Sequence, residues 1–252
     1  MFNRDTYVLE DSPIKNDLLK LFNPKDKLIV FDIGACEGEE SIRYSRIFPN
    51  AFVYCFEPLP KNQKRIVENL KKYNINNVRL IDAALSDEDG ECEFHVSSGH
   101  PETESKSLDW DFGNKSSSLL PPDKHLDRVP WLKFEEKIKV PTRTLNSFLL
   151  KNKIQEVDFV HMDVQGAELK VLKGAGKQIE KIKAIWLEVA DVSLYKGQAT
   201  RNTIESFMKE SNFYLVKSLV EGEVGDQMYL NKRYFKTISF LSFTKHFHLS
   251  PQ

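Results

Sequence analysis

The chain has 252 residues, of which 40% are hydrophobic, and this is enough to bury the core of one α/β domain. Its 36 basic and 37 acidic residues nearly cancel, so no overall field draws the chain toward nucleic acid or an anionic membrane. The three cysteines lack paired or metal-ligand spacing, and no apolar run approaches the roughly 20 residues of a membrane span. We therefore expect a soluble, cytoplasmic protein with free thiols.

The first part of the chain predicts a strict alternation of strands and helices. Ser12 and Pro13 are typical of the start of a helix, which carries Ile14 and Leu18 on one face and could cover the mouth of a ligand site. The elements expected next are strand 28–32, helix 37–48, strand 51–56, helix 60–73 and strand 78–82. Such alternation predicts a parallel sheet with helices on both faces.

Residues 97–137 interrupt this pattern, because they are rich in Ser, Pro, Asp and Lys and carry only scattered aromatic side chains. A polar insertion of this length inside a compact domain is usually functional or disordered, and we expect a lid-like segment. The elements expected after it are strand 137–144, a short helix from Leu145, strand 157–162, helix 167–180 and strand 183–189.

The last part of the chain predicts an antiparallel hairpin. Helix 202–211 is expected to open with a capping box formed by Asn202 and Glu205. Strands 213–220 and 226–230 follow, separated by a five-residue turn, and strands joined so closely must be antiparallel. The predicted fold is α/β and Rossmann-like, with a doubly wound, mostly parallel seven-stranded sheet that ends in this hairpin.

We expect three segments along the chain. Residues 1–27 form a helical cap, residues 28–231 form the main domain with its insertion, and residues 232–252 form an aromatic tail. The tail is broken by polar residues, so it could be a packed terminal helix or a contact in a homo-oligomer. Packing within the chain is the favoured interpretation.

An acidic, glycine-punctuated turn after strand 28–32 is the most informative feature of the chain. Gly34 and Gly38 lack a Cβ where the backbone must bend sharply and approach a ligand. Glu57 lies 19 residues beyond Gly38, at the end of the next strand, where its carboxylate can accept hydrogen bonds from both hydroxyls of a ribose. The combination predicts a nucleoside-binding crevice.

Seven short motifs lie along residues 28–230: Phe31–Gly38, Phe56–Pro58, Asp82–Ser86, Ser116–Leu119, Val140–Asn146, Met162–Glu168 and Val171–Ala175. Through these motifs the sequence resembles the FkbM family of methyltransferases. The last two form the most specific block, because their order behind the nucleoside signature is hard to obtain by chance. The resemblance implies the Rossmann-like fold of a class I methyltransferase, with S-adenosylmethionine as cofactor.

The resemblance also assigns cofactor-binding positions. They are Asp32, Gly34, Ala35 and Gly38 at the methionine end, Glu57 with Pro58 at the ribose, and Asp82 with Ala83 at the adenine. Asp82 fits its role, because a carboxylate at the end of a strand can accept from the exocyclic amine of adenine. The chain departs from the family pattern at Gln165, where Glu is frequent, and at Cys36, where many methyltransferases have glycine.

Methyl transfer to a hydroxyl needs alignment and removal of a proton, so the site needs a base. Asp163 follows the fourth parallel strand, and His161 precedes it by two residues, so both side chains point to the same face. Either could be the catalytic base. Alternatively, Asp163 could cap the helix that begins near Ala167, and His161 could be a satisfied core residue.

Further residues are candidates for binding the acceptor or a metal. Ser117, Ser118 and His125 lie in the insertion, and Glu188 ends the strand next to Asp163. A pair formed by Asp163 and Glu188 would suit Mg²⁺, but acidic strand ends are common in α/β domains without metal, so Mg²⁺ is a weak candidate and no resident metal is predicted. Tyr195 could stack on a sugar or anchor the insertion.

Two other classes of function share parts of this pattern. A nicotinamide-dependent oxidoreductase also needs a glycine turn and a ribose carboxylate, but no Tyr-x-x-x-Lys pair occurs in the middle of the chain. A non-catalytic scaffold of methyltransferase fold is the other alternative. The favoured hypothesis is an O-methyltransferase that acts on a hydroxyl of a saccharide, glycan precursor or other secondary metabolite, and not on nucleic acid.

Overall fold

Seven strands form the central sheet of the computed structural model, which describes residues 3–104 and 109–235. Their order is β3-β2-β1-β7-β8-β10-β9; neighbours from β3 to β8 are parallel, while β10 is antiparallel to both β8 and β9. The strands are β1 (Ile29–Ile33), β2 (Phe52–Phe56), β3 (Val78–Ile81), β7 (Val157–Met162), β8 (Ile182–Ala190), β9 (Phe213–Glu221) and β10 (Val224–Asn231). The predicted doubly wound sheet with an antiparallel end is confirmed.

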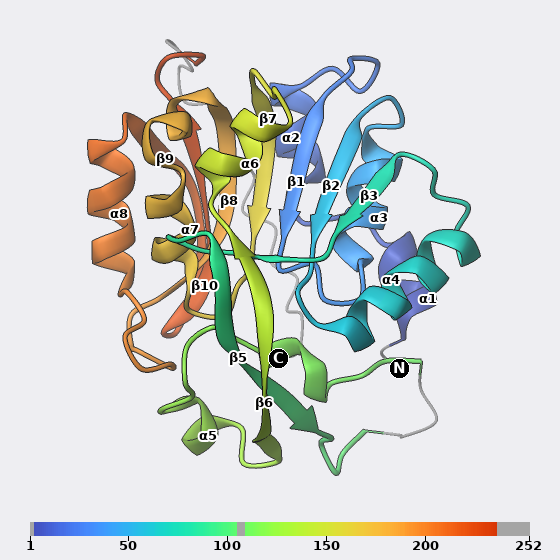
Figure 1. The fold of residues 1–252 in the computed structure, drawn as a ribbon. Coiled ribbons are helices and arrows are strands. Elements are labelled where there is room, and N and C mark those ends of the chain that lie inside the picture. The colour runs from blue at the N-terminus through green and yellow to red at the C-terminus, as the bar shows by residue number, and fades with distance from the viewer. Residues whose placement is uncertain (1–2, 105–108, 236–252) are drawn as a thin grey trace.

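Helices cover both faces of this sheet (Figure 1). They are α1 (Arg4–Leu9), α2 (Lys15–Leu21), α3 (Glu39–Ile47), α4 (Pro60–Lys72), α6 (Leu145–Lys151), α7 (Glu168–Gly174) and α8 (Arg201–Glu210). Phe31 and Val160 pack in a cluster with side chains of α6, α7 and α8. Val30 and Phe159, one position earlier on the same strands, pack on the other face with side chains of α2 and α3. The strands are therefore buried on both sides.

A second, three-stranded sheet occupies part of the predicted insertion. Its order is β4-β6-β5, with β4 (Ala84–Leu85), β5 (Gly90–Gly99) and β6 (Leu132–Arg143). The sequence pattern misses β5 and places the start of β6 five residues too late. Both strands expose polar side chains along one face, so neither has a continuous apolar run. Figure 1 shows this pair extending past the carboxyl ends of the central strands.

In the rest of the insertion, the described residues are irregular apart from the 3₁₀ helix η1 (Gly113–Ser116) and the short helix α5 (His125–Arg128). Helix 167–180 divides into α7 and the 3₁₀ helix η2 (Gly176–Lys181). Tight packing explains the small residue at the end of α7, because a Cβ on Gly174 would lie 2.0 Å from the carbonyl oxygen of Ser86.

Three local predictions about helix ends and turns are wrong. Helix α8 begins after Thr200, so Asn202 does not cap it, and Glu205 instead accepts a hydrogen bond from Gln227 at 2.7 Å. The turn between β9 and β10 has two residues instead of five, because the two strands pair as far as Glu221 and Val224. Helix α2 begins later than the cap motif indicates, and Ile14 is its N-cap residue.

Both ends of the described chain pack against the main core. Ile14 and Leu18 are fully buried, so α2 is part of the sheet's helical layer. Phe235 meets Phe22 edge-on at 6.2 Å, while residues 236–252 of the expected tail lie outside the described residues. Within the described ranges, no helix is long and apolar enough to cross a membrane.

Substitution of Gly34 tests the contact that closes the central turn. Gly34 has a φ of +86°, and a Cβ there would lie 1.8 Å from the carbonyl oxygen of Asp163. Gly197 has almost the same φ, +84°, but a Cβ there would meet nothing within 4 Å. We expect Gly197→Ala to lower the free energy of unfolding by about 1–2 kcal/mol through backbone strain alone. We expect Gly34→Ala to lower it by more than about 4 kcal/mol in urea unfolding. Equal losses would contradict the close approach.

Candidate active site

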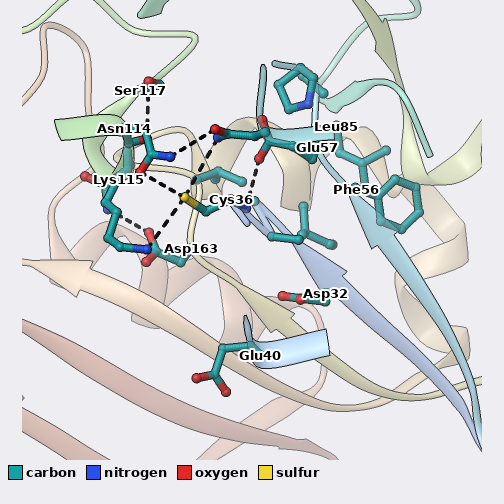
Figure 2. Close-up of a pocket in the computed structure, with 18 of the residues that line it drawn as sticks. Asp32, Cys36, Glu40, Phe56, Glu57, Leu85, Asn114, Lys115, Ser117 and Asp163 are labelled. Carbon is teal, nitrogen blue, oxygen red and sulfur yellow. Dashed lines mark hydrogen bonds between the residues drawn. The ribbon is translucent and has the colours of Figure 1, made fainter. Parts of the chain in front are cut away.

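A cavity opens at the carboxyl ends of β1, β2 and β7, at the point where the connections of the sheet run in opposite directions. It contains about 990 Å³, counting the open space at its mouth. Its wall comes from the turn between β1 and α3, the ends of β2 and β7, β4, and η1 of the insertion (Figure 2). This is the position that the sequence predicts for the crevice.

The turn after β1 is fixed to both neighbouring strands by backbone hydrogen bonds. The N–H groups of Gly34 and Ala35, which line the cavity, donate to the carbonyl oxygen of Phe56 at 3.1 and 3.0 Å. On the other side, the N–H of Asp163 donates to the carbonyl oxygen of Ile33 at 3.0 Å. The turn therefore joins the ends of three strands.

Gly38 does not line the cavity but determines where α3 begins. Its φ of +85° is in the left-handed region, and a Cβ there would lie 3.3 Å from the side chain of Ile66. Cys36 also has a positive φ, +50°, at the position where the resemblance leads us to expect glycine. Cys36 lines the cavity, and burial raises the pKa of its thiol, so it remains protonated.

Glu57 points into the cavity and is almost completely buried, with 4% of its surface exposed. Its Oε2 accepts from the N–H of Cys36 at 2.9 Å and its Oε1 from the N–H of Leu59 at 2.8 Å (Figure 2). Burial nevertheless raises the pKa of Glu57 to about 8. A buried carboxyl with this pKa can lose its proton when hydroxyl groups donate hydrogen bonds to its carboxylate form.

The residues predicted to contact ribose and adenine differ in how far they enter the cavity. Pro58 and Ala83 line it, and Ala84 and Leu85 of β4 extend the same wall. Asp82 is exposed after the end of β3 and is not among the lining residues. Its contact with adenine stays a prediction.

Asp32 and His161 form a buried pair at the floor of the cavity. Asp32 is 1% exposed; its Oδ2 accepts from the hydroxyl of Ser41 at 2.6 Å, and its Oδ1 lies 3.2 Å from Nδ1 of His161. Burial alone would lower the pKa of His161, but its hydrogen bond to Asp32 and the charges of Asp32, Glu40 and Asp163 raise that pKa to about 9. His161 is therefore an imidazolium at neutral pH.

Asp163 lines the cavity beside this pair. Its Oδ1 accepts from the Nε2 of Gln165 at 2.7 Å, and the Oε1 of Gln165 lies 2.9 Å from the hydroxyl of Tyr195. Burial raises the pKa of Asp163, against the opposing effects of Gln165 and His161. The side-chain amide of Gln165 is a neutral hydrogen-bond donor and thus orients Asp163. An ionised glutamate at this position has no donor and could not perform this role.

Two more carboxylates gather next to Asp163. One oxygen from each of Asp163, Glu168 and Glu188 lies within 4.8 Å of the other two. Glu168 uses Oε1 to accept from the N–H groups of Val164 and Gly166 at 3.1 and 3.2 Å, which closes the loop before α7. Burial, reinforced by the neighbouring negative charges, raises the pKa of Glu168 to about 7 and that of Glu188 well above its usual value. Glu188 is not among the lining residues.

The predicted substrate residues of the insertion divide into one that lines the cavity and two that anchor the insertion. Ser117 lines the cavity, and its Oγ accepts from the N–H of Ser97 at 2.9 Å. Ser118 is fully buried, and its hydroxyl donates to the carbonyl oxygen of Gln165 at 2.7 Å. His125 stacks on Tyr195 with ring centroids 5.3 Å apart. Tyr195 is only 1% exposed, so it anchors the insertion and presents no face for a sugar.

Helix α1 contributes residues that local sequence patterns did not indicate. Arg4 is fully buried and forms ion pairs with Glu37, Glu39 and Asp109. Tyr7 lines the cavity, and its hydroxyl donates to Oε1 of Glu40 at 2.7 Å. These contacts fasten the N-terminal helix and the insertion to the start of α3.

The insertion and α4 supply further residues that sequence reasoning missed. Asn114 is 4% exposed, and its Nδ2 donates to Oε1 of Glu37 at 3.1 Å and to Oδ1 of Asn62 at 3.0 Å. Lys115 reaches into the cavity, as Figure 2 shows, where its Nζ lies 3.3 Å from Oε1 of Glu39. The only signal for this segment was its family resemblance, which indicated the serines that follow.

Comparison with known protein families identifies the domain that carries this cavity. The family model of the methyltransferase FkbM domain matches residues 32–215. The chain belongs to the FkbM family of methyltransferases. It is therefore an S-adenosylmethionine-dependent methyltransferase, and the alternative of a nicotinamide-dependent oxidoreductase is not supported.

Individual relatives agree with this assignment. The 2-O-methyltransferase NoeI of Sinorhizobium fredii (strain NBRC 101917 / NGR234) is 31% identical over 220 residues, which cover 87% of this chain and 86% of NoeI. Methyltransferase 1 of Beauveria bassiana (strain ARSEF 2860) is 24% identical over 152 residues, or 60% of this chain and 59% of that protein. The crystal structure of methyltransferase FkbM from Methylobacillus flagellatus KT matches 90% of this chain and 50% of its own, with a TM-score of 0.50 and 14% identity, and supports the fold.

The chemistry of the cavity in this FkbM-family chain fits the cofactor. Glu57 presents a buried carboxyl at the end of β2, as the ribose hydroxyls require, and a cluster of carboxylates near β1 and β7 suits the positive charges of the methionine end. Gly34 and Ala35 bring backbone to the wall between these two regions. The predicted order of cofactor parts along the cavity is therefore compatible with the residues present.

The pKa of Glu57 predicts how cofactor affinity depends on pH. Hydroxyl donors favour the ionised carboxylate, whereas the free protein holds Glu57 protonated below pH 8, so the affinity for S-adenosylhomocysteine should rise with pH and level off above about 8. The rise should be at most about tenfold per pH unit, because one proton is released. Calorimetric titrations from pH 6 to 9 measure it.

Glu57→Gln should remove this pH dependence and weaken binding roughly 10-fold or more, because the charged acceptor is lost. Glu93→Gln, which changes an exposed carboxylate on β5, is the matched control and should behave as the unmodified protein. An affinity of the unmodified protein that is constant from pH 6 to 9 would contradict the role of Glu57.

Proposed function

We propose that this methyltransferase methylates a hydroxyl group of a saccharide, glycan precursor or similar small metabolite, and that Asp163 is the catalytic base. The observation that carries the proposal is the position of Asp163, a half-buried carboxylate that lines the cofactor cavity and is oriented by Gln165. The match to a protein named 2-O-methyltransferase supports oxygen as the methylated atom. The near-neutral chain gives no electrostatic reason to expect a polyanionic acceptor.

Bound S-adenosylmethionine supplies an electrophilic methyl group, and the residues of the chain align the acceptor and take its proton. The raised pKa of Asp163 makes it a stronger base than an ordinary carboxylate, so it can accept the hydroxyl proton as the oxygen attacks. Gln165 orients Asp163 through a hydrogen bond from its side-chain amide to Oδ1.

His161 serves as a positioning residue in this proposal. An imidazolium with a pKa of about 9 cannot accept a proton at neutral pH. Its positive charge opposes the rise in the pKa of Asp163 that burial causes, and this favours the carboxylate form that can accept a proton. Its contact with Asp32 fixes the ring at the floor of the cavity. Of the two predicted bases, Asp163 is therefore the favoured one.

Replacement of Asp163 tests the assignment of the base. Asp163→Asn should lower turnover roughly 100-fold or more, because an amide cannot accept the proton, while affinity for S-adenosylhomocysteine is retained. Mass spectrometry with a panel of mono- and oligosaccharides measures methyl transfer, and acceptors that lack the methylated hydroxyl should be inert. Asp87→Asn, an exposed carboxylate paired with Lys170, is the control. Turnover of Asp163→Asn at the normal rate would remove Asp163 from the mechanism.

Metal removal tests whether the neighbouring carboxylates hold a cation. We expect turnover to persist in EDTA, because burial and the neighbouring negative charges raise the pKa values of Glu168 and Glu188, which favours their neutral forms without a cation. The measurement compares initial rates in EDTA and in Mg²⁺ with the same acceptor. Loss of turnover in EDTA with recovery in Mg²⁺ would assign the three carboxylates to a cation instead.

A further inference from the structure

Almost all charged side chains that line the cofactor cavity are acidic. The carboxylates are Asp32, Glu39, Glu40, Glu57 and Asp163. The methionine part of the cofactor carries a carboxylate of its own, as well as its positive charges, and that group needs a cationic or N–H partner. Among the described lining residues, the cationic side chains are His161, which is paired with Asp32, and Lys115.

Lys115 lies at the turn that borders the methionine end. Its Nζ is 3.3 Å from Oε1 of Glu39, 3.8 Å from Sγ of Cys36, and 3.9 Å from the centroid of the Trp110 ring. Burial alone would lower the pKa of Lys115, but the neighbouring acidic groups raise it, so the side chain is charged. Figure 2 shows Lys115 approaching Cys36 from the insertion.

The insertion holds Lys115 in this place from both sides. The preceding residue, Asn114, is buried and bonded to Glu37 and Asn62. Two residues later, Ser117 is bonded to Ser97 of β5. A lysine fixed in this way loses less conformational freedom on binding a ligand than a lysine on a free surface loop.

The contact with Glu39 does not use all the N–H donors of Lys115. Oε1 of Glu39 also lies 3.4 Å from Nε of the buried Arg4, so Lys115 is not the only cationic partner of Glu39. A lysine ammonium has three N–H donors; one is directed to Glu39 and a second to Sγ of Cys36. The third donor can meet an anion in the cavity.

We propose that Lys115 binds the α-carboxylate of the cofactor and that the insertion is thereby a part of the cofactor site. This inference rests on the S-adenosylmethionine site described above and adds a residue to it. Lys115 binds the amino-acid part of the cofactor, whereas Glu57 binds the nucleoside. A ligand with the nucleoside, sulfur and amine but without the carboxylate should therefore be insensitive to Lys115.

Calorimetry with two ligands tests the proposal. S-adenosylhomocysteine carries the carboxylate, and its decarboxylated analogue S-adenosyl-3-thiopropylamine lacks it. Lys115→Met keeps the length of the side chain over Trp110 and should weaken S-adenosylhomocysteine roughly 10- to 150-fold, while the affinity for the analogue stays unchanged. Lys115→Arg should retain most of the affinity. Lys61→Met, which removes an exposed lysine paired with Asp111 outside the cavity, should change neither ligand.

The same titrations separate failure of the inference from failure of the cofactor site. An equal loss of affinity for both ligands in Lys115→Met would assign Lys115 a structural role and overturn the proposal. Unchanged binding of S-adenosylhomocysteine by Lys115→Met would also overturn it. If the unmodified protein bound neither ligand, the cofactor site itself would be wrong, and the inference would fall with it.

Discussion

The backbones of Gly34 and Asp163 approach each other so closely that a single Cβ on Gly34 would overlap the carbonyl oxygen of Asp163. Hydrogen bonds on either side, from Asp163 to Ile33 and from Gly34 to Phe56, hold the ends of β7, β1 and β2 in one unit. The cofactor turn and the proposed base therefore keep a fixed separation. Catalysis that depends on alignment requires such a rigid frame, because small displacements of the reacting groups are costly.

Buried charge is the second organising feature of the site. Burial raises the pKa values of Glu57, Glu168 and Glu188, whereas Asp32 and its neighbours hold His161 as an imidazolium. The cavity and the carboxyl groups beside it thus combine raised carboxyl pKa values with a fixed positive charge, and protons can be redistributed among them when a cationic cofactor and a hydroxyl acceptor enter. Buried charge also organises the contact among α1, the insertion and the start of α3. There the positive charge of Arg4 pairs with the carboxylates of Glu37, Glu39 and Asp109.

The sequence predicted the central sheet and the position of the cavity because their signals are local. A buried strand shows an apolar run, and Gly34 and Glu57 act at the ends of their own strands. It could not predict β5, which exposes a polar face, or the roles of residues that depend on distant partners. Lys115 contacts Glu39 and Arg4 contacts Asp109 only after the insertion has folded back over α3. The spacing of residues within the insertion or within α1 does not indicate contacts with partners so far away in the sequence.

A crystal structure with S-adenosylhomocysteine bound is the most direct test of how the cavity works. The ribose hydroxyls should lie within hydrogen-bond distance of Glu57, and the sulfur should lie on the side of the cavity that Asp163 lines. This arrangement would place the transferred methyl group next to the proposed base. A nucleoside bound away from Glu57, or a sulfur on the opposite side from Asp163, would contradict the proposed reaction geometry.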